Sequence, residues 1–545
     1  MKRKHLLGSL AATLFLSAGA TVSAQPSVTD TTLDSEAFRA RYGNVDIEIS
    51  CAPSASAHFE RGLLLMHSFA WSDARQAFRD AAEADPGCAM AYWGQAMGYY
   101  DGLHAHPSAE EVGEAREALA KARAAAAPTQ RERDYIAAAE EIYRGYPDVE
   151  RRQRDRAFSD ALGKLHTSYP AEDEAAALYA LSLLSLARRG VDNGYELQLQ
   201  AIGILEPMFE ALAEHPGVAH YTIHAYDDAG LRERGLAAAR RYAKIAPGLS
   251  HALHMPSHIF SGLGMWNEAI ASDESVLDVA PLNAHSSMYL AYAYMQKGQR
   301  EKAETLVEEL RALALSPNGT PANIRGLHSA NTWFLLEGHA WQEAAEAPEY
   351  SERLLDRAET LYVRGLGAAR SGDVEAANEQ LDALNDVIAE LVSGNDSGVA
   401  VRVQMSRSQA KQIEATIRLA ENEGEAAVAL MREAIEIADA PGVSWAPPDS
   451  GTGLPSHEVF GEILLELGRY DEAQREFEAA LERTPNRLRS IIGLARVAAA
   501  AGDQGGARDH YQALLQLLAD ADTGLAEAEE AREYLQGHQT ARTLP

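Results

Sequence analysis

Positive charge is scarce in this sequence of 545 residues: 49 lysines and arginines stand against 80 aspartates and glutamates, a formal net charge of −31. An acidic chain repels phosphate backbones and anionic lipid, so nucleic acid and membrane surfaces are poor candidates as partners. Beyond the N-terminal segment there is also no run of about 18 or more apolar residues, which argues against a membrane-spanning helix.

Common catalytic motifs are missing as well. The sequence contains no G-x-S-x-G element, no phosphate-binding loop, no G-x-G-x-x-G fingerprint and no H-E-x-x-H pair. Hydrolase and kinase functions therefore have no motif to support them, and no catalytic residue is predicted. Whether the protein is an enzyme is left open at this point.

The N-terminal segment "MKRKHLLGSLAATLFLSAGATVSAQ" has a basic start, an apolar run and small residues at Val22, Ser23 and Ala24. This pattern is typical of a secretory signal that is cleaved after the last small residue. No cysteine follows the apolar run, which argues against a lipid anchor. We predict that residues 1–24 are a signal peptide and that the mature protein is periplasmic or secreted.

Two segments far apart in the chain share one spacing of small and large residues. The first has these residues at Gly62, Ala74, Phe78, Ala81 and Pro86, and the second has them at Gly461, Ala473, Phe477, Ala480 and Pro485. The spacing resembles the tetratricopeptide repeat, a pair of antiparallel helices about 34 residues long. More degenerate copies end at Pro247 and Pro281, which are separated by one repeat length.

The repeat spacing predicts an all-α fold, a solenoid of antiparallel helix hairpins in which each hairpin buries its apolar stripe on its neighbours. Alanine, leucine, glutamate and arginine at helical spacing dominate, and strand signals are nearly absent. The predicted segments after the signal are a leader at 25–50, a histidine-bearing repeat array at 51–320, degenerate helical repeats at 321–439, a Pro/Gly-rich loop at 440–455, and a C-terminal repeat pair with a final helix at 456–545.

Cys51 and Cys88 are the only cysteines in the sequence. Cys51 lies just before the first helix of its predicted hairpin and Cys88 just after the second, and these two ends of an antiparallel hairpin are neighbours. We predict a disulfide between them, in keeping with an oxidising compartment. The alternative is two buried free thiols.

Histidines cluster in "HYTIHAYDD" and "HALHMPSHIF". When each repeat is counted from the same origin, the fifth and ninth positions of two consecutive first helices are His220, His224, His254 and His258. Residues four apart share a helix face, and first helices of consecutive repeats pack side by side. We therefore expect the four imidazoles to converge on the concave side. His251 and His285 take the second position of their helices, and Asp227 lies on the face of His224.

Paired histidines with a nearby carboxylate are typical of a Zn, Cu or Fe site, because neutral imidazole is a good ligand for these metals. Two other interpretations stay open. The histidines could line a metal-free groove that holds a peptide or an acid, or they could form a buried network that fixes the stacking of repeats. His67 is a weaker candidate in an earlier repeat.

Four motifs together resemble a family of exported bacterial tetratricopeptide repeat proteins: "CAMAYWGQAM", "HYTIHAYDD", "HMPSHIF" and "GEILLELGRYDEAQREFEAALERTPNR". The resemblance runs from about Cys51 to Ala501. It implies the repeat fold and the exported location, and it leaves the activity open because the family has no settled biochemical function.

These observations lead to one predicted function and one alternative. The predicted function is an exported solenoid with a transition-metal site built from His220, His224, His254 and His258. Asp227 and His251 are further ligands or orienting partners, since metal-bound imidazoles usually donate their other nitrogen to a carboxylate or carbonyl. An open coordination position would permit metal-activated water or oxygen chemistry. The alternative is a metal-free scaffold that binds a peptide or partner protein in its groove.

Overall fold

The structure is a computed structural model that describes residues 35–103, 107–187, 195–228, 230–394, 399–440, 448 and 453–537. Throughout these residues the chain forms helices, and no β-strand occurs among them. The predicted all-α solenoid is therefore confirmed. The predicted signal peptide lies outside the described residues, as do the start of the leader and most of the predicted Pro/Gly-rich loop.

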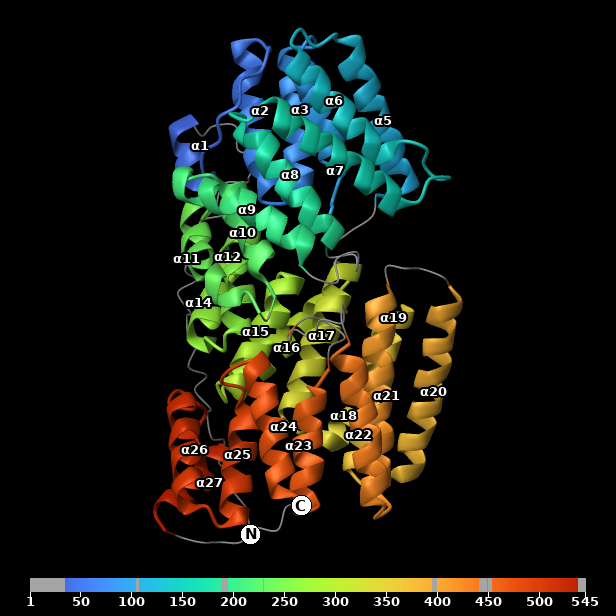
Figure 1. Ribbon diagram of the computed structural model, residues 1–545, viewed down its shortest axis with the longest axis vertical. Helices are drawn as coiled ribbons and strands as arrows, with labels where there is room; N and C mark the ends of the chain where they lie inside the picture. Colours follow the sequence, from blue (N-terminus) through green and yellow to red (C-terminus); the bar gives the residue numbers. More distant parts are fainter. Residues whose placement is uncertain are drawn as a thin grey trace, which may run out of the picture.

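The first group of helices forms the upper part of the molecule in Figure 1. Its members are α1 (Ser35–Tyr42), α2 (Pro53–His67), α3 (Trp71–Ala84), α4 (Ala89–Met97), α5 (Ala109–Ala124), α6 (Gln130–Tyr143), α7 (Arg151–Ser168), α8 (Asp173–Leu186) and α9 (Glu196–Ala211). Cys51 and Cys88 are joined by a disulfide, with their Cα atoms 4.8 Å apart, so it links the start of α2 to the start of α4.

The second group carries the clustered histidines and runs down the middle of the molecule. Its members are α10 (Pro216–Tyr226), the short 3₁₀ helix η2 (Arg232–Gly235), α11 (Leu236–Ile245), α12 (Ser250–His254), α13 (Pro256–Gly262), α14 (Trp266–Leu277), α15 (Ala284–Gln296), α16 (Arg300–Ala314), α17 (Pro321–Glu337) and α18 (Trp341–Ala345). Pro256 has no N–H to donate to the preceding turn, which accounts for the division of one predicted helix into α12 and α13.

The third group turns back toward the second. Its members are α19 (Leu354–Arg370), α20 (Val374–Ser393), α21 (Ala400–Ala420), α22 (Gly424–Ala438), α23 (Ser456–Glu466), α24 (Tyr470–Arg483), α25 (Leu488–Ala501), α26 (Gln504–Leu517) and α27 (Ala526–Leu535). None of the helices in the described part of the chain combines the length and the apolar character that crossing a membrane would need.

The repeat signature has a steric cause. A Cβ atom built on Gly62 would lie 2.7 Å from the ring of Phe78, and one built on Gly94 would lie 2.3 Å from it. Phe477 is held in the same way, 2.9 Å from a Cβ built on Gly461 and 2.4 Å from one built on Gly493. Each phenylalanine therefore fills the space that glycines leave on two successive repeats, which explains why the small and large positions recur together.

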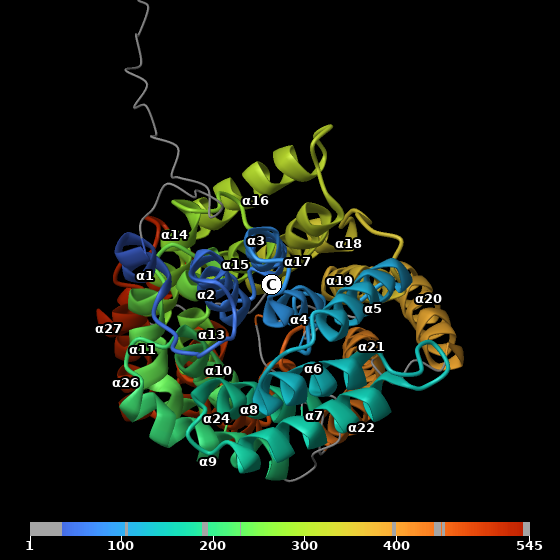
Figure 2. The same ribbon diagram turned by 90° about the horizontal axis from the view of Figure 1, so that it is seen from above.

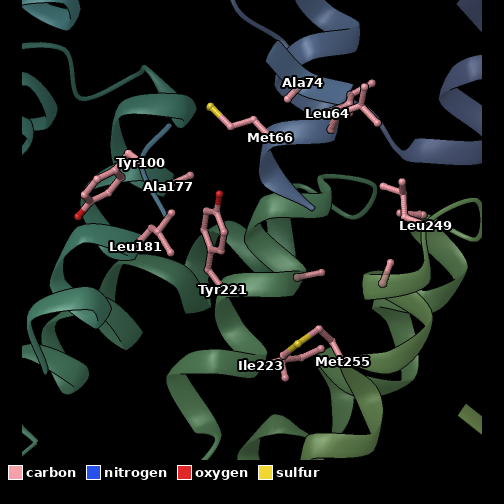
Figure 3. Close-up of a cluster of buried hydrophobic side chains, with 14 of the residues drawn as sticks. Leu64, Met66, Ala74, Tyr100, Ala177, Leu181, Tyr221, Ile223, Leu249 and Met255 are labelled. Carbon is pink, nitrogen blue, oxygen red and sulfur yellow. The ribbon is translucent and has the colours of Figure 1, made fainter. Parts of the chain in front are cut away.

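Buried apolar side chains hold α10 against α2 and α8. Figure 3 shows Met66 of α2, Leu181 of α8 and Tyr221 of α10 within one cluster, and all of these side chains are buried. This first apolar core continues to Trp333, and a second one begins at Leu335. The cores therefore change within α17.

The last repeats pack back onto the middle of the chain. The indole nitrogen of Trp266 donates to the carbonyl of Asn486 at 2.8 Å, and the Asn486 side chain donates to the carbonyl of Gly264 at 3.2 Å. Gly264 has φ of +65°, and a Cβ there would lie 1.9 Å from the carbonyl oxygen of Pro485. Figure 1 shows the red α26 below the green α14, and the view from above in Figure 2 shows both on the same side of the molecule, so the C-terminal repeats close onto the middle group.

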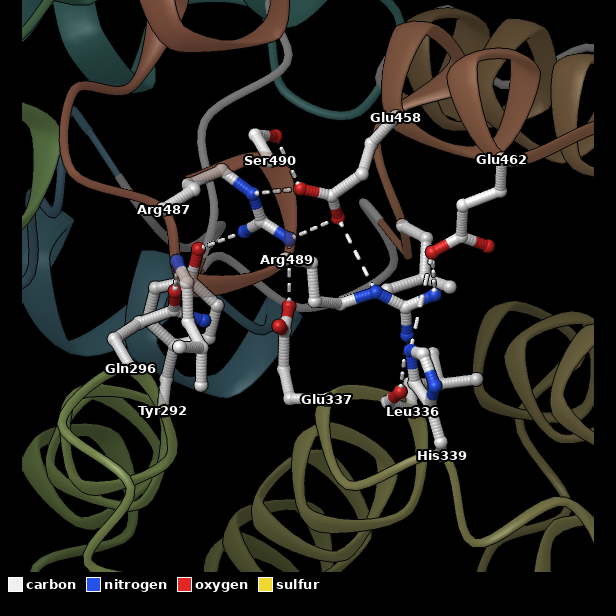
Figure 4. Close-up of polar contacts among 12 residues, drawn as sticks. Tyr292, Gln296, Leu336, Glu337, His339, Glu458, Glu462, Arg487, Arg489 and Ser490 are labelled. Atoms are coloured by element: carbon white, nitrogen blue, oxygen red, sulfur yellow. Dashed lines mark hydrogen bonds and ion pairs between the residues drawn. The ribbon is translucent and has the colours of Figure 1, made fainter. Parts of the chain in front are cut away.

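A buried arginine forms the centre of this closure (Figure 4). The side chain of Arg487 is fully buried, and its Nη2 lies 2.5 Å from Glu458 of α23 and 3.0 Å from Glu337 of α17. Its Nη1 donates to the hydroxyl of Tyr292 on α15. Burial opposes the charge, but the two carboxylates keep the pKa of Arg487 well above its usual value. One guanidinium thus joins the C-terminal repeats to α15 and α17.

Candidate metal centre

Three imidazoles from two consecutive repeats converge at what we call the first centre: His220 and His224 of α10, and His251 of α12. The Nε2 atom of His220 lies 3.0 Å from Nε2 of His224 and 2.9 Å from Nε2 of His251. His220 is fully buried and His224 is 9% exposed. All three can present one ligand atom to a common point.

The protonation of His220 is fixed by the backbone of an earlier repeat. Its Nδ1 lies 2.7 Å from the carbonyl oxygen of His67, 153 residues away. A carbonyl only accepts hydrogen bonds, so Nδ1 carries a proton and Nε2 is the nitrogen that presents the lone pair in the neutral form of the ring. This is the arrangement in which a histidine binds a metal through Nε2 while its other nitrogen is held by an outer partner.

Aromatic rings enclose the first centre. The ring of Phe69 lies 4.4 Å from His220, 5.8 Å from His224 and 5.4 Å from His251 between ring centroids. On the other side Tyr242 stacks on His220 at 5.0 Å with the ring planes nearly parallel. These contacts restrict the rotation of the imidazoles and keep bulk water away from their nitrogens, which preorganises the site for a ligand.

The second centre has the same composition one repeat later: His254 of α12, His258 of α13 and His285 of α15. The Nε2 atoms of His254 and His258 lie 3.1 Å apart. His285 lies 4.6 Å from His254 and 5.5 Å from His258 between ring centroids. His285 is exposed while the other two are buried, so the second centre reaches solvent at the position of His285.

Carboxylates hold the outer nitrogens of the second centre. Nδ1 of His254 lies 2.6 Å from Asp273, and Nδ1 of His258 lies 2.9 Å from Asp227. Burial lowers the pKa of His254 well below its usual value and raises the pKa of Asp273, so the His254 ring is neutral. The hydroxyl of Tyr289 also lies 3.1 Å from Nδ1 of His258. The carboxylates therefore direct both Nε2 atoms toward the shared point.

A third histidine group has a different character. The Nε2 atoms of His67 and His215 lie 2.7 and 3.1 Å from the two oxygens of Glu174. Nδ1 of His67 lies 2.9 Å from the hydroxyl of Tyr221, and Nδ1 of His215 accepts the backbone N–H of Val218. Both nitrogens of each ring are thus used within the protein. These contacts join α2, α8 and α10.

Burial and charge act against each other in this third group. Burial lowers the pKa of His67. Burial alone would raise the pKa of Glu174, but His67 and His215 bring that pKa below its usual value. The carboxylate therefore keeps its charge inside the fold, and its partners fix the end of α2 whose carbonyl orients His220.

A model of the tetratricopeptide repeat family matches residues 455–487 of the chain. The match covers α23 and α24, and it includes Gly461 and Phe477 of the repeat signature. The chain therefore contains a tetratricopeptide repeat at these residues. No curated protein matches the sequence.

Solved structures resemble this chain only distantly. A human IFIT1 dimer with m7Gppp-AAAA has 13% identity and a TM-score of 0.36, over 87% of this chain and 92% of that chain. The APC/C hetero-tetramer Cut9–Hcn1 has 11% identity and a TM-score of 0.29, over 90% and 97%. The TPR domain of P58(IPK) has 14% identity and a TM-score of 0.23, over 83% and 99%. At such low TM-scores these likenesses carry no conclusion about function.

The structure divides the predicted ligands between two centres. His220 and His224 join His251 in the first, and His254 and His258 join His285 in the second. The four imidazoles do not share one point. Each pair at the fifth and ninth positions lies closer to the histidine at the second position of the following helix than to the other pair. Asp227 lies behind His258 as an orienting partner.

Some groups that orient the histidines had no signal in the sequence. The carbonyl of His67 and the carboxylate of Asp273 come from elements whose approach to the histidines depends on the tertiary fold. His285 did have a signal, since it follows His251 by one repeat length. Extending the repeat count by one member identifies it as a third imidazole of the second centre.

Proposed function

We propose that this protein is an exported tetratricopeptide repeat scaffold that binds transition-metal ions, such as Zn, Cu or Fe, at its histidine centres. The observation that carries the proposal is the contact of two ring nitrogens, those of His224 and His251, with the single lone pair of His220. One imidazole lone pair accepts one hydrogen bond well, so a neutral His220 does not accept well from both rings. A cation coordinated by the three nitrogens would direct all three lone pairs to one point.

Three protein ligands leave a further coordination position in a tetrahedral site, as in zinc enzymes where water or substrate occupies the fourth position. Phe69 packs on the three imidazoles that would hold the ion, and His251 is the partly exposed one of the three. The bound ion would polarise a water molecule or another small ligand there. The role of the chain itself is to orient the imidazoles and to exclude bulk water.

Export is part of the proposal. It is supported by the basic, apolar and small-residue pattern of residues 1–24 and by the pair Cys51 and Cys88, since disulfides persist in oxidising compartments. Fractionation of cells that carry the full chain, with the mature N-terminus determined by mass spectrometry, tests this part directly. A mature protein that retains residues 1–24 in the cytoplasm would contradict it.

Elemental analysis tests the metal proposal. The full chain, purified without chelator or affinity-tag metal, should contain stoichiometric transition metal, and a His220→Ala/His254→Ala variant should lose it. His510→Ala is the matched control, because this partly exposed histidine belongs to neither centre. Circular dichroism would show that all three proteins keep their helices. A parent that takes up no Zn, Cu or Fe would leave the metal-free scaffold for a peptide or partner protein as the function.

Removing the carboxyl group behind His254 should weaken metal binding. Asp273→Asn keeps the size of the side chain but removes the carboxyl group whose Oδ1 lies 2.6 Å from Nδ1 of His254. Loss of an orienting partner typically costs 10- to 100-fold in metal affinity, and we expect a loss of about that size. Competition with a chromophoric chelator measures it. The control is Asp278→Asn, which changes an exposed aspartate directly after α14, the helix that carries Asp273. It should leave the metal affinity unchanged.

A further inference from the structure

We infer that the two centres bind two metal ions at the same time, as one paired site in which His285 is a ligand of the second ion. This inference rests on the proposed metal binding and adds to it a stoichiometry, a ligand and a spatial relation. The ions would be of the class that neutral imidazole prefers, divalent zinc or copper.

The first support is that the two centres are copies of each other in sequence. Every member of the second centre follows its counterpart in the first by the same interval: His220 and His254, His224 and His258, His251 and His285. This interval is the length of one tetratricopeptide repeat, about 34 residues. Consecutive hairpins therefore both carry histidine at three pairs of equivalent positions. A single structural contact between repeats would not need all three members to recur.

The second support is that the copies also agree in geometry. His220 and His224 lie 4.8 Å apart between ring centroids, and His254 and His258 lie 4.9 Å apart. The third ring, provided by the following helix, meets the first ring edge-on in both centres. The separation is 4.7 Å at 74° for His220 and His251, and 4.6 Å at 71° for His254 and His285. What one centre can bind, the other can therefore bind as well.

The centres are also direct neighbours. The rings of His224 and His258, one from each centre, lie 6.5 Å apart between centroids. Helix α12 contributes His251 to the first centre and His254 to the second. Asp227 follows the helix that carries His224, yet it orients His258. Ordering one centre therefore positions groups that belong to the other.

The third histidine group does not extend the pair to three ions. Glu174 already occupies the Nε2 atoms of His67 and His215, and Tyr221 and Val218 meet their Nδ1 atoms. With no lone pair left over, these rings need no ion. The expected stoichiometry is therefore two ions per chain.

Zinc titration of the full chain, stripped with chelator, tests the inference. Elemental analysis after gel filtration should give two Zn²⁺ per parent chain. His251→Ala and His285→Ala, which change the two more accessible members, should each retain one ion, and His510→Ala should retain two. One ion in the parent would overturn the pair while leaving the proposed function standing. No ion would overturn both. An unchanged count of two in His285→Ala would remove this residue as a ligand and overturn the inference.

Copper loading tests whether the two ions are neighbours. The electron paramagnetic resonance spectrum of the parent with two Cu²⁺ should show dipolar broadening that is absent from His251→Ala and from His285→Ala. A parent spectrum equal to the sum of the two single-variant spectra would mean that the ions are far apart, which contradicts the paired site.

Discussion

Replacing Arg487 with methionine should lower the free energy of unfolding by about 3–5 kcal/mol, the cost of breaking a buried ion pair by removing one partner. The substitution would leave Glu337 without the cation that it contacts and would leave Glu458 only the more distant Arg489, at 3.6 Å. Both glutamate side chains are nearly inaccessible to solvent. Urea denaturation followed by circular dichroism would show the loss as a lower midpoint. The same change should also loosen the contact between α25 and the helices α15 and α17.

The matched control for this prediction is Arg496→Met. Arg496 pairs with Glu530 at 2.7 Å, but about a quarter to a third of each side chain is exposed. A solvent-exposed pair of this kind contributes at most about 1 kcal/mol. Adding Glu337→Gln and Glu458→Gln to Arg487→Met should recover part of the stability, because it removes the uncompensated charges. Equal decreases in the free energy of unfolding for Arg487→Met and Arg496→Met would show that burial of the ion pair does not determine the size of the decrease.

Removing the disulfide should have an effect of similar size. The bridge between Cys51 and Cys88 closes a loop over a sequence separation of 37 residues. Closing a loop of that length lowers the conformational entropy of the unfolded chain, which stabilises the folded state by about 4 kcal/mol. Cys51→Ala/Cys88→Ala should therefore unfold at markedly lower urea than the oxidised parent.

A reducing agent provides the control. Dithiothreitol should lower the unfolding midpoint of the parent toward that of the double variant and should leave the variant unchanged. A reductant effect of the same size in both proteins would exclude the disulfide as its cause. Because α2 ends at the residue whose carbonyl orients His220, the reduced parent should also bind metal less tightly at the first centre than at the second.

The sequence was sufficient to predict the repeats because their packing is local. Phe78 and Phe477 each contact glycines of their own and the next hairpin, so the pattern recurs at a fixed spacing that is visible without a structure. The closure of the array was not predicted. Trp266 and Asn486 are 220 residues apart, and no periodic pattern relates them.

The site was predicted in part for the same reason. Helical spacing is local, so the pairing of His220 with His224 and of His254 with His258 follows from four-residue intervals. The division into two centres depends on the angle and offset between consecutive hairpins, which the spacing does not contain. The orienting groups, such as the His67 carbonyl, come from distant elements and leave no mark in the histidine motifs.

The contact of Gly264 with Pro485 and Asn486 has a consequence for how the chain can vary in length. An open array of repeats can gain or lose one unit at little cost, because each unit contacts only its neighbours. Here one additional hairpin between α14 and α24 would move Pro485 and Asn486 out of register with Gly264. No space remains at Gly264 for another arrangement. The contact thus fixes the number of hairpins between α14 and α24.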